Sequence, residues 1–446
     1  MPYDPAIDRR TFLGYAAALG SALAPGSSWA LSGRDPAEFR GRKPRVALVG
    51  TGIRGIKMWG RELRATDADL VDLVALSDTN PKRLAFARGF VGGGLPTYVD
   101  CDAMLDAEKP DVLVVATPDA THDAYVAKAL ARGMNVVTEK PMTTDETKCR
   151  AILAAEKASG KPIVVGFNYR FSPIMEHVKR TIDSGALGRI LSLDLSWYLD
   201  VAHGADYFRR WHGVRAASGT LFVHKATHHF DLVNWWLEDE PKTVSARGRT
   251  NVYGRSGPFR GATCRDCKHR KDCRFAFDAA ADPLLKALYL DCEDADGYRR
   301  DACLFREEID VYDTMGAVVS YGKGATLTYS LNAAMPYEGF QLGINGTEGR
   351  LDVRRFDRQP WSRPQGAEFR LSKIFGATET TDMKIASENH WGGDGPLRRM
   401  IFTPDAPDPL RRRAGSRAGA MSILTGVAAV RSVERDGAQV AISDLF

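Results

Sequence analysis

Lysine and histidine side chains stand at two places where they could exchange a proton with a bound molecule. Lys140 lies between a glutamate and a proline at the end of the apolar run in NVVTEKPMTTD. A lysine there is poorly placed for core packing but well placed for reaching into a cleft. His224, Lys225 and His228 follow later in HKATHH. Imidazole and amine groups can donate or accept protons in a suitable environment, so the two groupings are candidates for acid–base chemistry.

His224 and His228 are also four residues apart, a spacing that two zinc ligands on a helix can have. The glutamate of the H-E-x-x-H pattern is missing from the intervening residues. The sequence therefore favours proton transfer over metal binding at these two histidines.

Strands that alternate with helices supply the framework for Lys140. The apolar runs RVALV, VDLVALSD, DVLVVATP and MNVVTEKP are separated by helical patterns. Nearly continuous apolar strands between helices are typical of a doubly wound parallel sheet. An α/β domain is therefore predicted over residues 43–167.

A glycine-rich turn follows the first strand and opens a helix. Gly50, Gly52 and Gly55 form the G-x-G-x-x-G pattern of a Rossmann domain, and Ile53 and Arg54 lie within it. The first glycine makes the tight turn, and the second lets the backbone approach a pyrophosphate at the helix N-terminus. The turn therefore predicts a dinucleotide site, with a flavodoxin-like sheet that binds no dinucleotide as the alternative.

Asp78 ends the second strand, 23 residues after Gly55. A carboxylate there accepts hydrogen bonds from ribose hydroxyls and repels a 2′-phosphate, which favours NAD over NADP. Thr117 and Pro118 end a later strand, and Glu139 and Lys140 end the next one. Ligands of doubly wound sheets lie outside the carboxyl ends of the strands, so these residues are predicted to line one crevice with Lys140 pointing into it.

The pattern changes after residue 168. The strands predicted from there onward follow one another with few helices between them, which indicates a mostly antiparallel open sheet in an α+β second domain over residues 168–446. A cysteine-rich insertion interrupts this domain at about residues 254–305. A last amphipathic helix over 418–437 is expected to pack back on the first domain.

Five stretches together resemble the Gfo/Idh/MocA oxidoreductases, a family named for glucose–fructose oxidoreductase and inositol dehydrogenase. They are VGTGIRG, VVATPDATH, VTEKPMT, GFNYRFSP and HKATHHFDLVNWWL. The resemblance implies an NAD(P)-dependent enzyme that transfers hydride at a hydroxyl carbon of a sugar or cyclitol. It implies a catalytic role for Lys140, extends the cofactor site to His122, and implies a homo-oligomer, either a dimer or a tetramer.

The resemblance also assigns the later histidines. Alignment on Asp231 puts His228 at the position of the family's catalytic histidine. His224 then stands where the family commonly has an aspartate, with Lys225 beside it. Lys140 and His228 are expected to share proton transfer at the hydroxyl, and His224 to polarise or relay a proton.

A second resemblance lies in NHWGGDGPLRRMIF, which is similar to a segment of NAD-dependent retaining glycosidases. It implies that His390 and Asp394 face the sugar. A glycosidase or lyase that acts by transient oxidation and elimination is therefore an alternative function. A non-catalytic sugar-binding protein with the same fold is an alternative of another class.

Aromatic and arginine residues are further candidates for substrate contact. Tyr169 and Arg170 follow the last strand of the first domain and should lie at the domain crevice. Tyr207, Arg210 and Trp211 lie in the loop-like stretch GADYFRRWHG, which suits either a sugar platform or an interface loop.

The insertion carries five of the seven cysteines. Cys264, Cys267, Cys273 and Cys292 are predicted to hold a structural zinc, since four thiolates suit its tetrahedral geometry. Disulfides or free thiols are the alternatives, and Cys303 is left over.

The N-terminal segment and the overall charge predict where the protein is located and which partners it has. Twin arginines, a short apolar run and a small-residue site over residues 1–31 are typical of a Tat export signal, which predicts a periplasmic or secreted protein. No other segment has 18 consecutive apolar residues, so no membrane span is expected in the mature chain. The net charge of +5 is scattered, which disfavours nucleic-acid binding.

Overall fold

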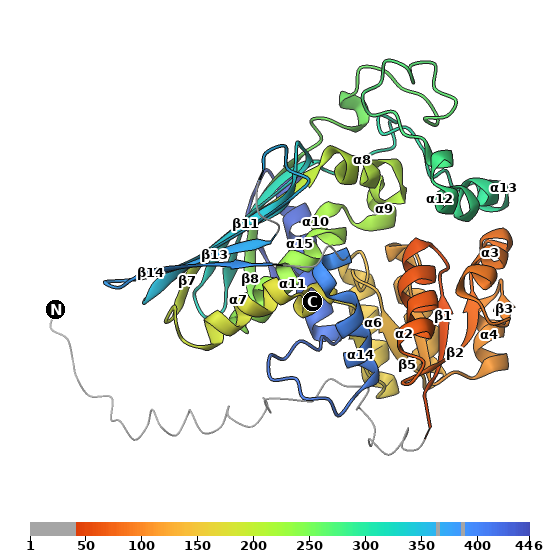
Figure 1. Ribbon diagram of the computed structural model, residues 1–446, viewed down its shortest axis with the longest axis horizontal. Helices are drawn as coiled ribbons and strands as arrows, with labels where there is room; N and C mark the ends of the chain where they lie inside the picture. The colour runs from red at the N-terminus through yellow and green to blue at the C-terminus, as the bar shows by residue number, and fades with distance from the viewer. Residues whose placement is uncertain (1–41, 363–365, 385–388) are drawn as a thin grey trace.

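The computed structural model describes residues 42–362, 366–384 and 389–446. The export signal predicted over residues 1–31 lies outside the described residues. Within them, no helix is both long and apolar enough to cross a bilayer. The described chain forms two domains side by side, each built on its own sheet (Figure 1).

The first sheet has six parallel strands in the order β3-β2-β1-β4-β5-β6, the doubly wound order that the sequence predicts. Every residue of β4 and β5 is buried, as expected for a sheet covered on both faces. The strands are β1 (Arg45–Val49), β2 (Asp72–Ser77), β3 (Thr97–Tyr98), β4 (Val112–Val115), β5 (Asn135–Thr138) and β6 (Ile163–Val165).

Helices connect these strands, and local capping fixes where several of them begin. The Asn80 side chain accepts hydrogen bonds from the backbone N–H groups of Lys82 and Arg83, and Pro81 occupies the first helical position. Asp145 caps the last of these helices in the same way, through the N–H of Lys148. The helices are the π-helical η2 (Gly55–Glu62), α2 (Leu63–Thr66), α3 (Pro81–Val91), α4 (Cys101–Glu108), η3 (Asp119–Thr121), α5 (His122–Ala131) and α6 (Glu146–Ser159).

Alternate residues of β1 face two different layers of helices. Val46 and Leu48 belong to an apolar cluster with residues of η2, α3 and α14 (Asp394–Phe402). Ala47 and Val49 belong to another cluster, with residues of α4, α5 and α6. A helix from the end of the chain thus completes one face of the first domain.

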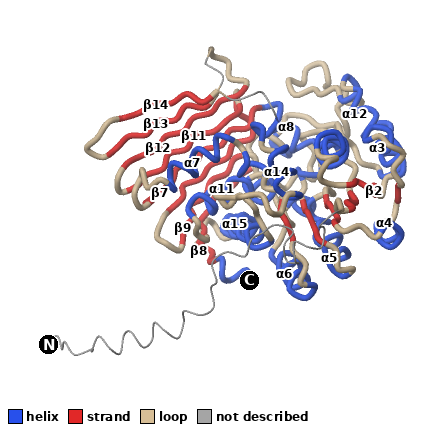
Figure 2. The backbone as a smooth tube through the Cα atoms, turned by 60° about the horizontal axis from the view of Figure 1, so that its bottom comes forward, coloured by secondary structure: helices blue, strands red, loops and turns tan. Residues whose placement is uncertain are grey.

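The second sheet has nine strands in the order β14-β13-β12-β11-β7-β10-β9-β8-β15. All neighbours are antiparallel except β7 and β10, which confirms the mostly antiparallel open sheet. Figure 2 shows these strands side by side in one layer. Its strands are β7 (Ile190–Asp200), β8 (Pro241–Arg249), β9 (Thr314–Tyr321), β10 (Thr326–Met335), β11 (Glu338–Gly346), β12 (Gly349–Asp357), β13 (Ala367–Lys373), β14 (Thr378–Met383) and β15 (Val440–Ala441).

Helices fill the space between the two sheets. The C-terminal helix α15 packs on β8 and α11, and its Arg431 forms an ion pair with Glu146 of α6, with 2.6 Å between the nitrogen and oxygen atoms. Residues 204–213, predicted as loop-like, are mostly helical, because Asp200 caps a helix there by accepting from two backbone N–H groups. The helices are η4 (Asn168–Phe171), α7 (Pro173–Asp183), α8 (Val201–Arg209), η5 (Trp211–Gly213), α9 (Arg215–Ser218), α10 (Leu221–His224), α11 (Ala226–Leu237), η9 (Asn389–Gly392), α15 (Ser416–Glu434) and η10 (Ile442–Leu445).

The insertion between β8 and β9 leaves the large sheet and returns over the first domain. Its last helices lie beside α3, at the upper right of Figure 1. The elements of this insertion are η6 (Gly254–Ser256), η7 (Ala279–Ala281), α12 (Pro283–Leu288), η8 (Leu290–Cys292) and α13 (Glu293–Asp296).

Candidate active site

A cavity of about 1310 Å³ lies between the two domains. The carboxyl ends of β1, β2, β4 and β5 form one wall, and α8, α10 and α11 form the other. Residues predicted for the site from different parts of the sequence therefore meet around one space. Those that line it are Gly50, Gly52, Ile53, Arg54, Asp78, Thr117, Pro118, His122, Glu139, Lys140, Tyr169, Tyr207, Arg210, Trp211, His224, Lys225, His228 and His390.

The glycine turn requires its glycines for packing. Gly50 has φ +94°, and a Cβ there would lie 2.5 Å from the carbonyl oxygen of Ala116. A Cβ on Gly55 would lie 2.0 Å from the carbonyl oxygen of Gly50, which is why Gly55 supports the turn without lining the cavity. The resulting bare backbone at the start of a helix fits a dinucleotide pyrophosphate.

Asp78 braces this turn. One carboxylate oxygen accepts from the backbone N–H and the hydroxyl of Thr51, at 2.8 and 2.9 Å. The other accepts from the backbone N–H of Asn80 at 2.9 Å and from Arg83 at 3.2 Å. Four hydrogen bonds occupy the roughly four acceptor positions of a carboxylate, so a ribose hydroxyl would share an oxygen with these donors. The charge of Asp78 nonetheless lies at the cavity wall.

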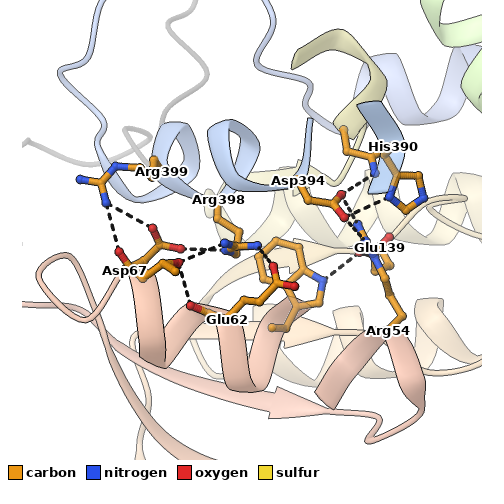
Figure 3. Close-up of polar contacts among 11 residues, drawn as sticks. Arg54, Glu62, Asp67, Glu139, His390, Asp394, Arg398 and Arg399 are labelled. Atoms are coloured by element: carbon orange, nitrogen blue, oxygen red, sulfur yellow. Dashed lines mark hydrogen bonds and ion pairs between the residues drawn. The ribbon is translucent and has the colours of Figure 1, made fainter. Parts of the chain in front are cut away.

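Arg54, Glu139 and Asp394 form one ionic network, shown in Figure 3. Arg54 donates to Glu139 at 2.7 Å and to both oxygens of Asp394, at 2.9 and 3.1 Å. Burial acts to raise the pKa of Asp394, but the charge of Arg54 and hydrogen bonds from His390 and Arg54 outweigh it and lower this pKa. The expectation that Asp394 faces the substrate is therefore not met, since its carboxylate is used to join α14 to the first domain.

His390 lies above this network. Its Nδ1 is 3.0 Å from Asp394, and its ring packs near Tyr169 with centroids 5.9 Å apart. His390 and Trp391 both have positive φ, near +52°, a conformation that non-glycine residues adopt only when their surroundings hold them. His390 lines the cavity as predicted, while its partner Asp394 lies behind it.

Lys140 lies at the centre of the cavity wall. Its Nζ donates to the backbone carbonyl oxygen of His224 at 3.2 Å. Burial lowers the pKa of this lysine, against the opposing charges of Asp119 and Glu139. The strand-end lysine thus reaches across the cleft to the second domain, where a reacting group would lie.

Asp119 is a site residue that the sequence analysis missed. Its carboxylate lies 2.5 Å from Nδ1 of His224 and is almost fully buried. Burial raises the pKa of Asp119 well above its ordinary value, and burial followed by the charge of Lys140 lowers the pKa of His224. The family's aspartate is absent from position 224, yet a carboxylate from the first domain reaches that place. Its position directly after Thr117-Pro118, at a strand end, was the available signal.

Lys225 and His228 are buried against aromatic rings. The ring of His228 stacks on Tyr169 with centroids 4.3 Å apart, and its buried Nδ1 has no hydrogen-bond partner among the described residues. Burial and the nearby lysine charges lower its pKa well below the usual histidine value, so the ring is neutral near neutral pH. Lys225 donates to the Tyr169 hydroxyl at 3.4 Å, and burial lowers its pKa to about 8.

Other predicted residues line the rim or support the walls. Tyr207, Arg210 and Trp211 line the cavity, and Arg210 pairs with Asp206 at 2.9 Å. His122 is a brace rather than an open ligand, since its ring nitrogens lie 2.9 Å from the carbonyl oxygens of Thr117 and Pro141.

Arg170 does not reach the cavity. Both its side chain and that of Asp231 are buried, and two hydrogen bonds of 2.6 and 2.8 Å join them. The expected substrate contact is replaced by a structural ion pair inside the second domain.

The cysteine grouping differs from the predicted one. Cys264, Cys267 and Cys273 line a small secondary cavity together with Cys303, not with Cys292. Cys292 instead lies next to α12, where its thiol donates to the carbonyl oxygen of Ala287 at 3.3 Å. All seven cysteines are free thiols, and the described residues contain no group of three potential ligands arranged to hold a metal ion.

A glycine turn shaped for a pyrophosphate, facing buried proton-transfer groups across one cavity, defines a dinucleotide-dependent enzyme. Comparison with family models agrees with this class. Residues 44–167 match the oxidoreductase family with an NAD-binding Rossmann fold, and residues 175–352 match the GFO/IDH/MocA C-terminal domain. The chain therefore belongs to the Gfo/Idh/MocA oxidoreductase family.

The chain is also similar to individual proteins and to solved structures. The chain is 37% identical to YteT of Bacillus subtilis, a protein that is named as an oxidoreductase. The match covers 87% of this chain and 95% of YteT. It is 32% identical to inositol 2-dehydrogenase 4 of Saccharopolyspora erythraea over 46% of this chain and 57% of that enzyme. Among solved structures, the fold is similar to that of the WlbA dehydrogenase of Bordetella pertussis in complex with NADH and UDP-GlcNAcA. The TM-score is 0.61 at 21% identity, covering 90% of this chain and 99% of WlbA.

Proposed function

We propose that this oxidoreductase transfers hydride between nicotinamide and a hydroxyl-bearing carbon of a sugar or cyclitol. The observation that carries the proposal is the meeting of Lys140, His224 and His228 around the cavity that also contains the glycine turn. These groups come from different domains, and burial perturbs the pKa of each. Perturbed titratable groups that converge in a cleft are typical of catalytic sites.

The protein groups divide the proton chemistry between them. When bound, the dinucleotide supplies the hydride acceptor. Lys140 donates a hydrogen bond to the substrate oxygen and stabilises the negative charge that develops on it. His228, which is neutral near neutral pH, accepts the hydroxyl proton. Asp119 holds the His224 ring through its Nδ1, so that the opposite ring nitrogen keeps a fixed role in the cavity.

The lining of the cavity suits a small polyol. Tyr207 and Trp211 offer ring surfaces, and Arg210 and Lys225 offer hydrogen-bond donors to hydroxyl oxygens. Relatives support this substrate class, since one is named for inositol and WlbA was solved with a nucleotide sugar.

We propose NAD rather than NADP as the cofactor. Asp78 and Asp296 both contact the guanidinium of Arg83, at 3.2 and 2.7 Å, beside the glycine turn. Two carboxylates around one arginine leave a net negative charge, which repels a 2′-phosphate. Asp78 would thus favour NAD through its charge and not through the direct ribose contact expected from the sequence.

Net oxidation is favoured over elimination or glycoside hydrolysis. The similarity to NAD-dependent glycosidases rests on His390 and Asp394, and Asp394 is committed to Arg54, His390 and Asn168. His390 alone remains available to a sugar.

The enzyme is further proposed to be exported and to form a homo-oligomer. The twin-arginine pattern of residues 1–31 supports export of a folded, cofactor-loaded enzyme to the periplasm or the medium. A homodimer or homotetramer that forms through the open face of the large sheet is also proposed, as the family resemblance implies.

A substrate panel tests the function. Purified protein is mixed with sugars, cyclitols and aryl glycosides, while reduced nicotinamide is followed by absorbance. At least one free polyol should reduce the bound dinucleotide in proportion to enzyme sites. Release of aglycone over many turnovers without an added acceptor would instead identify a glycosidase.

A further inference from the structure

The insertion between β8 and β9 crosses from the second domain to the nucleotide side of the cavity. Leu288 of α12 is fully buried in the apolar cluster that contains Leu84 and Val91 of α3. Figure 1 shows α12 and α13 next to α3, far from the sheet from which the insertion starts. The end of the insertion is thus seated on the Rossmann domain itself.

Buried hydrogen bonds hold the end of the insertion against the Rossmann domain. Asn80, which is fully buried, donates to the backbone carbonyl oxygen of Cys292 at 2.9 Å. Arg83, which contacts Asp78, donates to Asp296 at 2.7 Å. The residues that follow the second Rossmann strand therefore hold the insertion directly beside the glycine turn.

Tyr289 reaches the turn. Its hydroxyl oxygen accepts the backbone N–H of Ile53 at 3.0 Å, and a Cβ on Gly52 would lie 3.5 Å from the same oxygen. An oxygen that accepts this hydrogen bond still carries its own proton. No described residue accepts that proton, and Tyr289 lines the cavity with Gly52 and Asp296. The free donor therefore points to an anionic ligand at the turn.

We propose that residues 283–298 form a clamp that retains the dinucleotide, with the Tyr289 hydroxyl donating to an oxygen of its diphosphate. The inference rests on the proposed dinucleotide cofactor. With the glycine turn on one side and the clamp on the other, release of the dinucleotide requires opening of the contacts made by Asn80 and Arg83. Retention suits an enzyme that works away from a pool of free nucleotide.

Nucleotide release tests the clamp without relying on turnover. The protein is loaded with NAD, and the dissociation rate is measured by a chase with a fluorescent NAD analogue. Denaturation and mass spectrometry give the nucleotide that remains bound. Tyr289→Phe keeps the ring and should speed release about tenfold, since it removes a hydrogen bond to a charged group. Tyr289→Ala should speed it further, and Lys157→Ala on the exposed side of α6, outside the clamp, should leave it unchanged.

The outcomes separate the clamp from the proposed function. Wild-type release rates in both Tyr289 variants, in a protein that still oxidises a polyol with bound NAD, would overturn the clamp alone. A wild-type protein that binds no added dinucleotide would overturn the clamp together with the cofactor proposal. Equal far-ultraviolet circular dichroism of wild type and Tyr289→Phe shows that any difference arises in a folded protein.

Discussion

The glycine-turn end of the cavity and the α10–α11 end differ in how their polar groups are satisfied. At the glycine turn, Asp78 accepts four hydrogen bonds and Arg54 is paired with two carboxylates. At the other end, His228 has a ring nitrogen without a partner among the described residues, and Lys225 has one long hydrogen bond of 3.4 Å. Asp78, Lys225 and His228 are all buried, so the difference between these groups lies in pairing and not in exposure.

This difference separates a preformed binding frame from a reactive region. Paired groups hold a fixed backbone shape for a ligand and keep their charge. Unpaired buried groups are costly, and the cost appears as lowered pKa values of Lys225 and His228. Lys225 and His228 both line the cavity, and we propose that a bound substrate accepts a hydrogen bond from the Lys225 amine.

Removal of Lys140 should have the largest effect. Lys140→Met deletes the group that is proposed to stabilise the charge on the substrate oxygen, and kcat should fall roughly a hundredfold to ten-thousandfold. Nucleotide content and circular dichroism should match wild type. The matched control is Lys128→Met, which removes a partly exposed lysine of α5 that pairs with Asp102 outside the cavity, and it should retain activity. Near-normal turnover in Lys140→Met would show that this lysine is structural.

Asp119 should matter less than Lys140, because it acts through His224. Asp119→Asn keeps the size of the side chain but removes the titratable carboxyl group beside Nδ1 of His224, and kcat should fall roughly tenfold to a hundredfold. The pH profile of kcat should shift with little change in nucleotide binding. Asp123→Asn, four residues further along, is the control. An unchanged pH profile in Asp119→Asn would remove Asp119 from the proton chemistry.

Replacing Lys225 with methionine should stabilise the folded protein and weaken substrate binding. Burial lowers its pKa from 10.5 to about 8, which costs on the order of 3 kcal/mol of folding free energy wherever the group is charged. Because the folded-state pKa is below the unfolded one, the penalty is complete below about pH 8 and disappears as the pH rises toward 10.5. Lys225→Met should therefore be more stable than wild type near neutral pH and lose this advantage in alkali.

Urea unfolding of the apoprotein, near neutral pH and again near pH 10.5, measures this difference in stability. Lys225→Arg is the control variant, because it keeps the positive charge. Substrate affinity of Lys225→Met should fall. Equal stability of Lys225→Met and wild type near neutral pH would mean that the lysine finds a partner in the folded protein, and the contrast between the two ends would weaken.

The smallest effect is expected on the outside of the clamp. Lys82 and Asp294 form an ion pair with both side chains more than half exposed. Lys82→Ala should leave the free energy of unfolding close to that of wild type, since exposed pairs contribute little. NAD release should stay at the wild-type rate. A large change in thermal unfolding would show that the clamp is held mainly by its surface charges.

Local patterns predicted the frame better than the reactive region. The order of apolar strands and the glycine spacing specify the Rossmann sheet, and the strand-end position of Lys140 directs it into the cleft. Asp119 was missed because its partner His224 is 105 residues away in sequence. Arg170 and Asp394 were placed in the cavity because their long-range partners, Asp231 and Arg54, could not be seen.

The insertion shows the same limit. Spacing grouped Cys292 with three nearby cysteines, whereas the chain turns back through Cys303 and sends Cys292 toward α3. The strands β13 and β14 were also absent from the prediction. The residues of β14 are polar and mostly exposed, so they give no apolar signal. In β13 the apolar Ala367, Phe369 and Leu371 alternate with polar residues, and this signal was overlooked.

The central claim is that hydride passes between a substrate carbinol and the dinucleotide in this cavity. A single-turnover reaction with a polyol deuterated at the reacting carbon, followed by mass spectrometry of the bound nucleotide, tests it most directly. The account predicts that deuterium enters the nicotinamide of wild type, with far slower transfer in Lys140→Met. Nicotinamide that stays unlabelled and oxidised with every polyol that binds would contradict the account.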